Sequence, residues 1–557
     1  MPDHSRAIEA KPSLPWPRWQ AALMVPGSAV LVVAFPVLAA VLTARAFPPQ
    51  NLGWIAWVGL VPFCLVIPNS SWTFERYLGA ILASLTFYAI GLSFIDTFDQ
   101  VLSSASPGQF RQLWLAATIL GIWVWPMTLL LSRRLHLRCG FPLTASFPIA
   151  WVIVEHARHW FCLLLVGNEC PWLHLGYSQV EFGPVLQIAA IGGMDLVSFL
   201  ICSVNAAIAV AILALHKQEW PGRCERAGLA LTALSFLAAV SYGSHQLALE
   251  AQAPSAVFRV ALVPRARMIA HAGSEAHMLD RDLEGRGFRP DLLLYGENTV
   301  ESLPIPSTPS TSVEPRSDEG GWGAILGDVA RKMGAHLVVG TTRVSNSGGS
   351  DRRHVCAVLV SPEAGVVAWS DKSVLVPFAE SSPAWANHPW VRAFLPVTDK
   401  SGDFTPSGRM GTFATPAQDL LGEVRLGAAI CYDVSSVGTF RAAAPQSDAF
   451  LVLGNEPVDP RRCTPSWLLN MTRCRAVETH RAIARTSIGG TICVINPDGG
   501  IMAASFPKLG TFEDSILLAT LPLSNIGTPY GLMGDWLVPL CWSSVAIGLL
   551  WSHRTRK

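Results

Sequence analysis

The stretch RLGAAICYD at residues 425–433 carries the pattern that decides the fold of the second half of this chain. A short apolar run leads directly into Cys431, and two polar side chains follow, Tyr432 and Asp433. Short apolar runs bounded by polar residues are typical of buried β-strands. The residue at the end of such a strand points into the crevice where open α/β sheets place their chemistry. The pattern predicts that Cys431 lies at the functional edge of a sheet.

Two other apolar runs end in the same way. The run LLLYGE (292–297) closes on Glu297, and VVAWSDK (366–372) closes on Lys372. Taken singly, a glutamate at the end of a strand is usually a solvated turn residue, and a cysteine that follows an apolar run, as Cys431 does, is usually a core residue. Together, a carboxylate can take the proton of a thiol while an ammonium group holds negative charge. The three residues therefore form a candidate catalytic site with the thiol of Cys431 as the nucleophile.

The segment around these runs alternates short β-rich stretches with polar helical ones. This alternation predicts an α/β layered domain. We expect helices at 321–333 and 464–482. The expected strands are 258–264, 291–296, 335–344, 354–370, 422–431, 448–454, 483–495 and 514–522.

The composition of the 557-residue chain excludes an ordinary cytosolic protein. Hydrophobic residues make up 50% and charged residues only 15% of the sequence, whereas soluble domains carry about 25% charged residues. The apolar content is also too high for a disordered chain. The net charge of +1 carries no signature of nucleic-acid binding.

Long apolar runs in the first half predict a membrane domain. A helix needs about 20 residues to cross a bilayer, and Asp195 suggests that one of the helices begins near Gly193. We expect about eight spans, a membrane domain at 1–247, a catalytic domain at 248–530 and a last span with its tail at 531–557. The candidate spans are 20–44, 53–68, 77–95, 113–131, 142–157, 188–215, 227–246 and 532–551.

Lysine and arginine residues in the loops predict the orientation of these spans. Clusters such as Arg133, Arg134 and Arg138 alternate with loops that hold one arginine each. Positively charged loops stay in the cytoplasm. With both termini inside, the soluble domain is expected on the outer side of the cytoplasmic membrane.

Several longer segments resemble one known family. The Glu–Lys–Cys order, with DKSVLVPFAE (371–380) and MTRCRAVETHRAIAR (471–485), is similar to the nitrilase, or carbon–nitrogen hydrolase, superfamily. GWIAWVGLVPF (53–63) and PWLHLGYSQ (171–179) are similar to membrane segments of the apolipoprotein N-acyltransferase family. The resemblance implies a transmembrane helical bundle joined to an αββα sandwich.

The resemblance also implies a reaction and its partners. The donor would be a membrane phospholipid, and the acceptor the N-terminal amine of a diacylglyceryl-cysteine apolipoprotein, with the acyl group carried as a Cys431 thioester. Glu297 would be the base, and Lys372 would face the oxyanion. No cofactor, metal or nucleic acid is expected. The supporting residues would be Glu380, Tyr432, Asp433 and Asn455.

Some segments depart from the family pattern and leave alternatives open. The stretches 264–267 (PRAR) and 455–458 (NEPV) differ from the usual loops, and Asp433 replaces a glutamate. A paralogue that acylates another amine or hydrolyses an amide is one alternative, and a non-catalytic membrane scaffold or transporter is another. Whether Cys463 and Cys474 form a disulfide is left open by the sequence.

Overall fold

The fold of this chain is described from a computed structural model. It describes residues 29–68, 74–97, 108–252, 256–264, 279, 283, 287–300, 303, 321–347, 350–394, 404–417, 422–456, 463–505 and 516–554.

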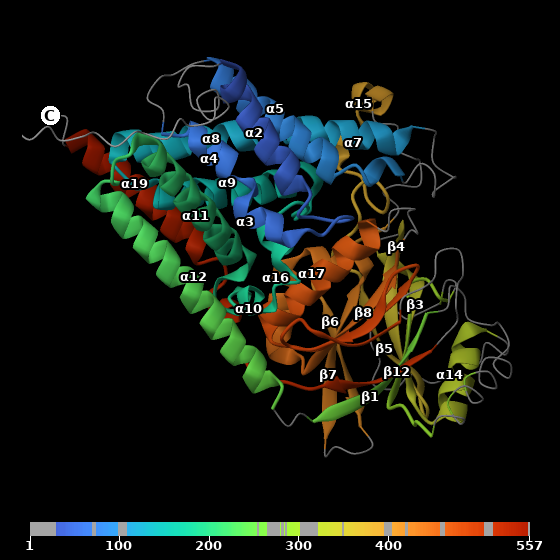
Figure 1. Cartoon of the computed structure of the whole chain (residues 1–557). Helices are drawn as coiled ribbons and strands as arrows, with labels where there is room; N and C mark the ends of the chain where they lie inside the picture. The colour runs from blue at the N-terminus through green and yellow to red at the C-terminus, as the bar shows by residue number, and fades with distance from the viewer. Residues whose placement is uncertain are drawn as a thin grey trace, which may run out of the picture.

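The first half of the chain is a bundle of apolar helices, drawn in blue to green in Figure 1. The last helix of the chain, α19 (Leu537–Arg554), returns to this bundle and packs against α9. Short 3-10 turns connect several helices: η1 (Gly53–Ile55), η2 (Ile95–Thr97) and η4 (Leu175–Gln179). The α-helices before the sheets are α2 (Ala29–Ala44), α3 (Ala56–Gly59), α4 (Val61–Val66), α5 (Phe74–Gly91), α7 (Gln109–Leu120), α8 (Val124–Arg133), α9 (Leu143–Val166), α10 (Gly183–Leu186), α11 (Ala189–Lys217) and α12 (Arg223–Glu250).

Four helical segments are long and apolar enough to cross a membrane: Phe110–Arg138, Leu143–Val166, Ala189–Lys217 and Arg223–Glu250. Ala29–Ala44, Gly53–Val66 and Leu537–His553 are shorter apolar helices. The total of about eight spans therefore stays a prediction.

Two details of the predicted spans can be compared with the helices. The helix expected to end near residue 157 continues to Val166, because its charged side chains Glu155 and Arg158 are buried inside the protein. The expected helix start near Gly193 is confirmed: Gly192 and Gly193 have non-helical backbone angles inside α11, and regular helix resumes after them.

The second half of the chain contains two six-stranded sheets with orders β12-β1-β2-β3-β4-β5 and β11-β10-β9-β8-β7-β6. The sheets face each other, with β2 in contact with β8 and β9, and β4 with β7. Their strands are β1 (Val257–Val263), β2 (Leu292–Tyr295), β3 (His336–Ser347), β4 (Ser350–Ser361), β5 (Gly365–Asp371), β6 (Gly411–Pro416), β7 (Glu423–Ile430), β8 (Ala449–Asn455), β9 (Ile483–Ile488), β10 (Ile492–Ile495), β11 (Ile501–Ser505) and β12 (Leu517–Pro522).

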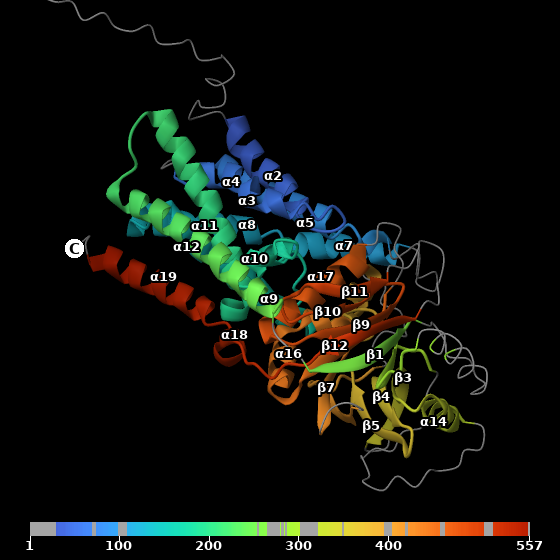
Figure 2. The same ribbon diagram turned by 60° about the horizontal axis from the view of Figure 1, so that its bottom comes forward.

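Helices cover the outer faces of both sheets (Figure 2). Helix α14 (Trp322–Met333) packs on β3, β4 and β5. On the other side, α16 (Val437–Ala443) and α17 (Cys463–Thr479) pack on each other and on the turn η6 (Cys431–Ser435). The α/β domain is thus a helix–sheet–sheet–helix sandwich, as predicted.

The sequence predicts fewer strands than the structure contains. The run 354–370 forms two antiparallel strands, β4 and β5, and the run 483–495 forms β9 and β10. Strands β6 and β11 were not predicted. Both are edge strands with few fully buried residues, so they lack the continuous apolar run of a central strand.

The α/β domain rests on one end of the helical bundle through α17. This helix and the short α18 (Pro529–Met533) both contact α11. Arg475 of α17 donates a hydrogen bond to the hydroxyl of Tyr177 in η4, and its Nε lies 3.1 Å from Oε2 of Glu478. All three side chains are buried, so the contact between the two halves is well packed.

Cys463 and Cys474 do not form a disulfide. Both lie on α17, eleven residues apart, and both are free thiols. At about 1.5 Å per residue this places their backbones roughly 16 Å apart, and a disulfide needs Cα atoms within about 7 Å.

Candidate active site

Lys372 follows the carboxyl end of β5 and lies between two carboxylates. Its Nζ donates hydrogen bonds to Oε1 of Glu297 at 2.9 Å and to Oε1 of Glu380 at 2.7 Å. Only 1% of Lys372 and 3% of Glu297 is exposed to solvent. Two predicted catalytic residues and one supporting residue are therefore in direct contact.

Glu297 is held close to the neighbouring strands by its turn after β2. The carbonyl of Gly296 accepts a hydrogen bond from the N–H of Gly340 in β3, and the N–H of Glu297 donates to the carbonyl of Gly454 in β8. A Cβ atom on Gly340 would lie 2.5 Å from Cα of Glu297. Glycine is required at 340, because any side chain would push this turn away from its position.

Asp433 connects the segment after Lys372 to the turn that carries Cys431. Its Oδ1 accepts hydrogen bonds from the backbone N–H groups of Ser373 at 3.0 Å and Val374 at 2.7 Å, and its Oδ2 accepts from Ile430 at 2.8 Å. Asp433 is 1% exposed. Its carboxylate therefore holds two segments of the site together and does not face the cavity.

Cys431 lies at the point where β7 turns into η6. Its φ of +47° is in the left-handed region, which is uncommon for a residue other than glycine and recurs at functional sites. The Sγ atom is 3.9 Å from the carbonyl oxygen of Asn455 at the end of β8, and Glu297 and Cys431 lie close enough to shift each other's pKa. The three predicted catalytic side chains therefore converge.

Burial and neighbouring charges set the protonation of this site. Burial raises the pKa of Glu297 although Lys372 opposes the shift, and burial together with Glu297 raises the pKa of the Cys431 thiol well above its usual value. Burial disfavours the charge on Lys372, but Glu297 and Glu380 outweigh it and raise the pKa of Lys372. These shifts favour a protonated thiol on Cys431 and a charged ammonium group on Lys372.

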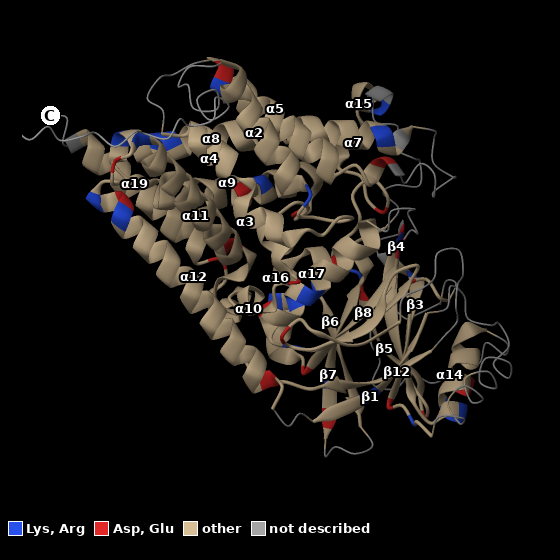
Figure 3. Cartoon of the chain, viewed as in Figure 1, with Lys and Arg blue, Asp and Glu red and all other residues tan. Residues whose placement is uncertain are grey.

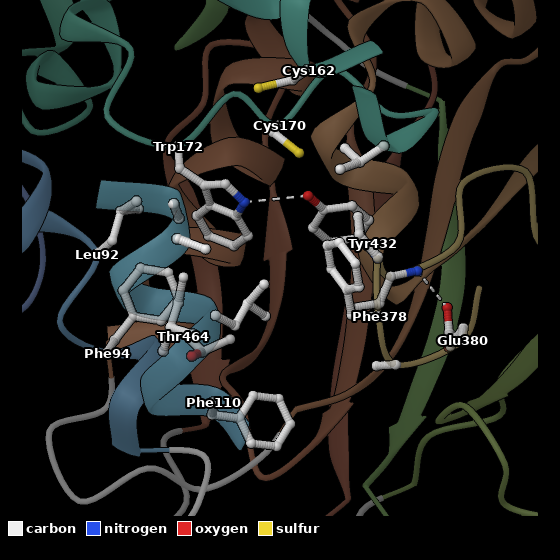
Figure 4. Close-up of a pocket in the computed structure, with 18 of the residues that line it drawn as sticks. Leu92, Phe94, Phe110, Cys162, Cys170, Trp172, Phe378, Glu380, Tyr432 and Thr464 are labelled. Atoms are coloured by element: carbon white, nitrogen blue, oxygen red, sulfur yellow. Dashed lines mark hydrogen bonds between the residues drawn. The ribbon is translucent and has the colours of Figure 1, made fainter. Parts of the chain in front are cut away.

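A cavity of about 540 Å³ opens from these residues towards the helical half. Glu297, Glu380, Cys431 and Asn455 line it on one side. The surface that lines the cavity is mostly apolar, and Figure 4 shows aromatic side chains projecting into it. This is the size range of small-molecule sites, about 300–1,000 Å³. Among the aromatic and aliphatic residues in its walls are Leu92, Phe94, Phe110, Trp172 and Phe378.

Tyr432 and Trp172 join the turn η6, which carries Cys431, to the helical half of the chain. The indole Nε1 of Trp172 donates a hydrogen bond to the Tyr432 hydroxyl at 3.2 Å, and the two rings stack with centroids 5.9 Å apart (Figure 4). Trp172 belongs to the loop between α9 and η4. The wall of the cavity beside Cys431 is therefore built from both halves of the chain.

The sequence reasoning missed several neighbours of the site. Trp172 and Phe378 lie inside quoted motifs but were not predicted to be site residues. Glu456, directly after β8, and Arg485, inside β9, form a fully buried ion pair. A Cβ on Gly490 would lie 2.0 Å from Oε2 of Glu456, so this glycine makes room for the pair. The NEPV stretch thus turns one of its residues, Glu456, away from the cavity; residues 457 and 458 lie outside the described residues.

Among the described residues, no cluster of possible metal ligands lies at the site around Lys372. The group of ligand-type side chains found among the described residues lies in the helical half instead and consists of Glu155, His174 and Asp195.

Comparison with known proteins agrees with this arrangement. Residues 39–207 match a family model described as the apolipoprotein N-acyltransferase N-terminal domain, and residues 323–528 match the carbon–nitrogen hydrolase model. A protein of Geobacter metallireducens named apolipoprotein N-acyltransferase is 25% identical over 92% of this chain and 93% of its own length. The chain belongs to the apolipoprotein N-acyltransferase family. It is therefore an acyltransferase with a nitrilase-like catalytic domain.

Other relatives with the same name cover most of the chain. A protein of Chromobacterium violaceum is 24% identical over 95% of both chains, and one of Pseudomonas aeruginosa is 27% identical over 82% of this chain and 83% of its own. Among solved structures, an amidase of the nitrilase superfamily from Nesterenkonia covers 52% of this chain and 98% of its own at 20% identity, with a TM-score of 0.34. A nitrilase-superfamily member from Saccharomyces cerevisiae covers 48% and 90%, at 18% identity and a TM-score of 0.34.

Proposed function

We propose that this acyltransferase moves an acyl chain from a membrane phospholipid, through a thioester on Cys431, to the N-terminal amine of a diacylglyceryl-cysteine apolipoprotein. One observation carries the proposal. Glu297, which is paired with Lys372, and Cys431 line an apolar cavity whose other walls come from the helices of the membrane half. A lipid ester can reach the thiol there while its chain stays in apolar surroundings.

In the first half-reaction, Glu297 takes the proton of the Cys431 thiol as the sulfur attacks the ester carbonyl of the phospholipid. The ammonium group of Lys372 is then available to stabilise the oxyanion of the tetrahedral intermediate. The ester C–O bond breaks, and the leaving oxygen takes the proton from Glu297. Lysophospholipid departs, and Cys431 carries the acyl group.

In the second half-reaction, the amine of the apolipoprotein attacks the thioester carbonyl. Glu297 accepts a proton from the attacking nitrogen, the C–S bond breaks, and the sulfur of Cys431 takes that proton from Glu297. Glu380 is assigned a positioning role. Its Oε1 accepts from Lys372 at 2.7 Å and its Oε2 accepts from the N–H of Val376 at 2.8 Å, so it fixes the cation rather than the amine.

The apolar helices and the family together indicate an inner-membrane protein. We place the membrane domain at 1–247, the catalytic domain at 248–530 and the last span with its tail at 531–557, with about eight spans in all. Many of the Lys and Arg residues of the bundle lie at its end farthest from the sheets (Figure 3). Because such residues favour the cytoplasm, this distribution supports a periplasmic catalytic domain.

The acceptor is the part of the proposal that needs the sharpest test. The full-length enzyme in detergent should be incubated with a chain-labelled phospholipid and a diacylglyceryl lipopeptide that has a free N-terminal amine. We expect the label on that amine, and no transfer to the same lipopeptide with an acetylated N-terminus. Release of free fatty acid, or transfer to an unrelated amine in preference, would instead support the paralogue alternative.

A further inference from the structure

Three buried polar side chains meet in the helical half, outside the cavity of the catalytic site. Glu155 lies on α9, His174 directly precedes η4, and Asp195 lies just after the kink in α11. Nε2 of His174 is 2.9 Å from Oδ1 of Asp195 and 3.4 Å from Oε2 of Glu155. Their exposed fractions are only 4%, 3% and 7% for Glu155, His174 and Asp195.

One imidazole nitrogen cannot satisfy two carboxylates. Nε2 carries a single hydrogen at most, which it can donate to one oxygen. Oε2 of Glu155 is buried and accepts no hydrogen bond from the described residues. Because a buried carboxylate without a matching charge is costly, this oxygen points to a cation in the middle of the group.

The spacing of the three atoms suits a small metal ion. Zinc is bound by histidine nitrogen and carboxylate oxygen at about 2.0–2.2 Å, which by geometry places tetrahedral ligand atoms roughly 3.3–3.6 Å apart. The three ligand atoms of the group lie within 4.8 Å of one another, so a small movement completes the shell. We propose that Glu155, His174 and Asp195 bind a divalent transition-metal ion, with zinc as the ion that their mixed nitrogen and oxygen set fits.

In known metal sites, the nitrogen or oxygen of a ligand side chain that does not bind the metal is hydrogen-bonded to a neighbouring group. The three candidate ligands have neighbours of this kind. Ser198 Oγ lies 3.3 Å from Nδ1 of His174 and can accept its proton, which leaves the lone pair of Nε2 for the metal. Oε1 of Glu155 accepts the backbone N–H of Leu175 at 2.7 Å. Oδ2 of Asp195 lies 3.3 Å from Nδ1 of His156.

The site would stabilise the wall of the catalytic cavity. A metal here joins α9 and α11 to the loop that runs from Gly167 to His174, and Trp172 of that loop donates its hydrogen bond to Tyr432 beside the nucleophile. None of the three ligands lines the cavity. The ion would therefore have a structural role. The proposal of this metal site holds whether or not the proposed acyl acceptor is correct.

The test uses the full-length protein in detergent, stripped with EDTA and then given ZnCl₂. We expect one zinc per chain by elemental mass spectrometry after desalting, and a higher unfolding temperature with zinc than without it. His174→Gln and Glu155→Gln should retain less than roughly one tenth of that zinc. His245→Gln, which changes an exposed histidine on α12, should retain all of it. Full zinc binding by His174→Gln would overturn the proposal.

X-ray absorption on the wild-type protein decides the matter even if the variants fail to fold. The first shell should contain nitrogen and oxygen at about 2.0–2.2 Å, whereas a zinc–sulfur distance of about 2.3 Å would move the ion to cysteines such as Cys162 and Cys170. A wild-type chain that binds no zinc and shows no change in unfolding temperature would also overturn the proposal.

Discussion

The ammonium nitrogen of Lys372 lies 2.9 Å from Oε1 of Glu297, and both side chains are buried at the ends of strands from the same sheet. The base of the proposed reaction is thus paired with the cation that faces the oxyanion. Glu380 contacts the same nitrogen from the other side, so the charge on Lys372 is held by two carboxylates. A change in any one of the three groups alters the charge balance of the other two.

Replacing Glu297 separates its role as a base from its role as a partner of Lys372. Glu297→Gln keeps the shape and can still accept a hydrogen bond but cannot take the thiol proton. Thioester formation should fall by about 10²–10⁴, the usual cost of losing a general base. Single-turnover measurement with phospholipid alone isolates this step. Glu423→Gln, an exposed glutamate in β7, is the matched control, and a Glu297→Gln rate equal to wild type would remove Glu297 from this role.

Filling the cavity tests whether it holds the acyl chain. Ala117 lies on α7 and lines the cavity, so Ala117→Trp should slow thioester formation from long-chain phospholipids more than from short-chain ones. Ile119 lies two residues further along the same helix and is 60% exposed, so Ile119→Trp should leave both rates unchanged. The ratio of the two donor rates is the measurement. An unchanged ratio in Ala117→Trp would place the acyl chain elsewhere.

The proposed orientation can be tested by thiol labelling in whole cells. Cys224, at the exposed start of α12, should react with a membrane-impermeant maleimide only after the cells are permeabilised. Glu423→Cys in a Cys224→Ala background places a thiol on the α/β domain, and it should react in intact cells. The reverse pattern would put the catalytic domain in the cytoplasm and exclude apolipoproteins on the outer face as acceptors.

The buried ion pair of Glu456 and Arg485 should matter for stability. Neither side chain is exposed, so Glu456→Gln or Arg485→Met leaves one buried charge without its partner, at a cost of about 3–5 kcal/mol in unfolding free energy. The double variant Glu456→Met/Arg485→Met should be less destabilised than the sum of the two single changes. Thermal unfolding in detergent measures this, and strictly additive losses would show that the two charges do not interact.

Much of the catalytic centre could be predicted from the sequence because its residues stand at the ends of strongly apolar strands. Burial of β2 and β7 positions Glu297 and Cys431 almost regardless of the loops between them, whereas Lys372 follows the half-buried edge strand β5. Asp433 and Tyr432 were expected near the site for the same reason. Their actual contacts, backbone N–H groups for Asp433 and the indole of Trp172 for Tyr432, depend on segments far away in the sequence.

Other features could not be predicted because they depend on how distant segments pack. The cavity is formed by helices and loops that are separated by hundreds of residues. Glu155, His174 and Asp195 stand about 20 residues apart and match no metal motif of short spacing, so the sequence suggested no metal. The edge strands β6 and β11 were missed because their half-buried residues show no distinct pattern.

The most direct test of the account is the chemical state of Cys431 after incubation with phospholipid in the absence of any amine acceptor. Mass spectrometry of the digested full-length protein should find an acyl group on the Cys431 peptide, and hydroxylamine should remove it because it is a thioester. Cys431→Ser should carry no such thioester, while Cys224→Ser should be modified like wild type. An unmodified Cys431 in wild type, or undiminished lipopeptide acylation by Cys431→Ala, would contradict the proposed mechanism.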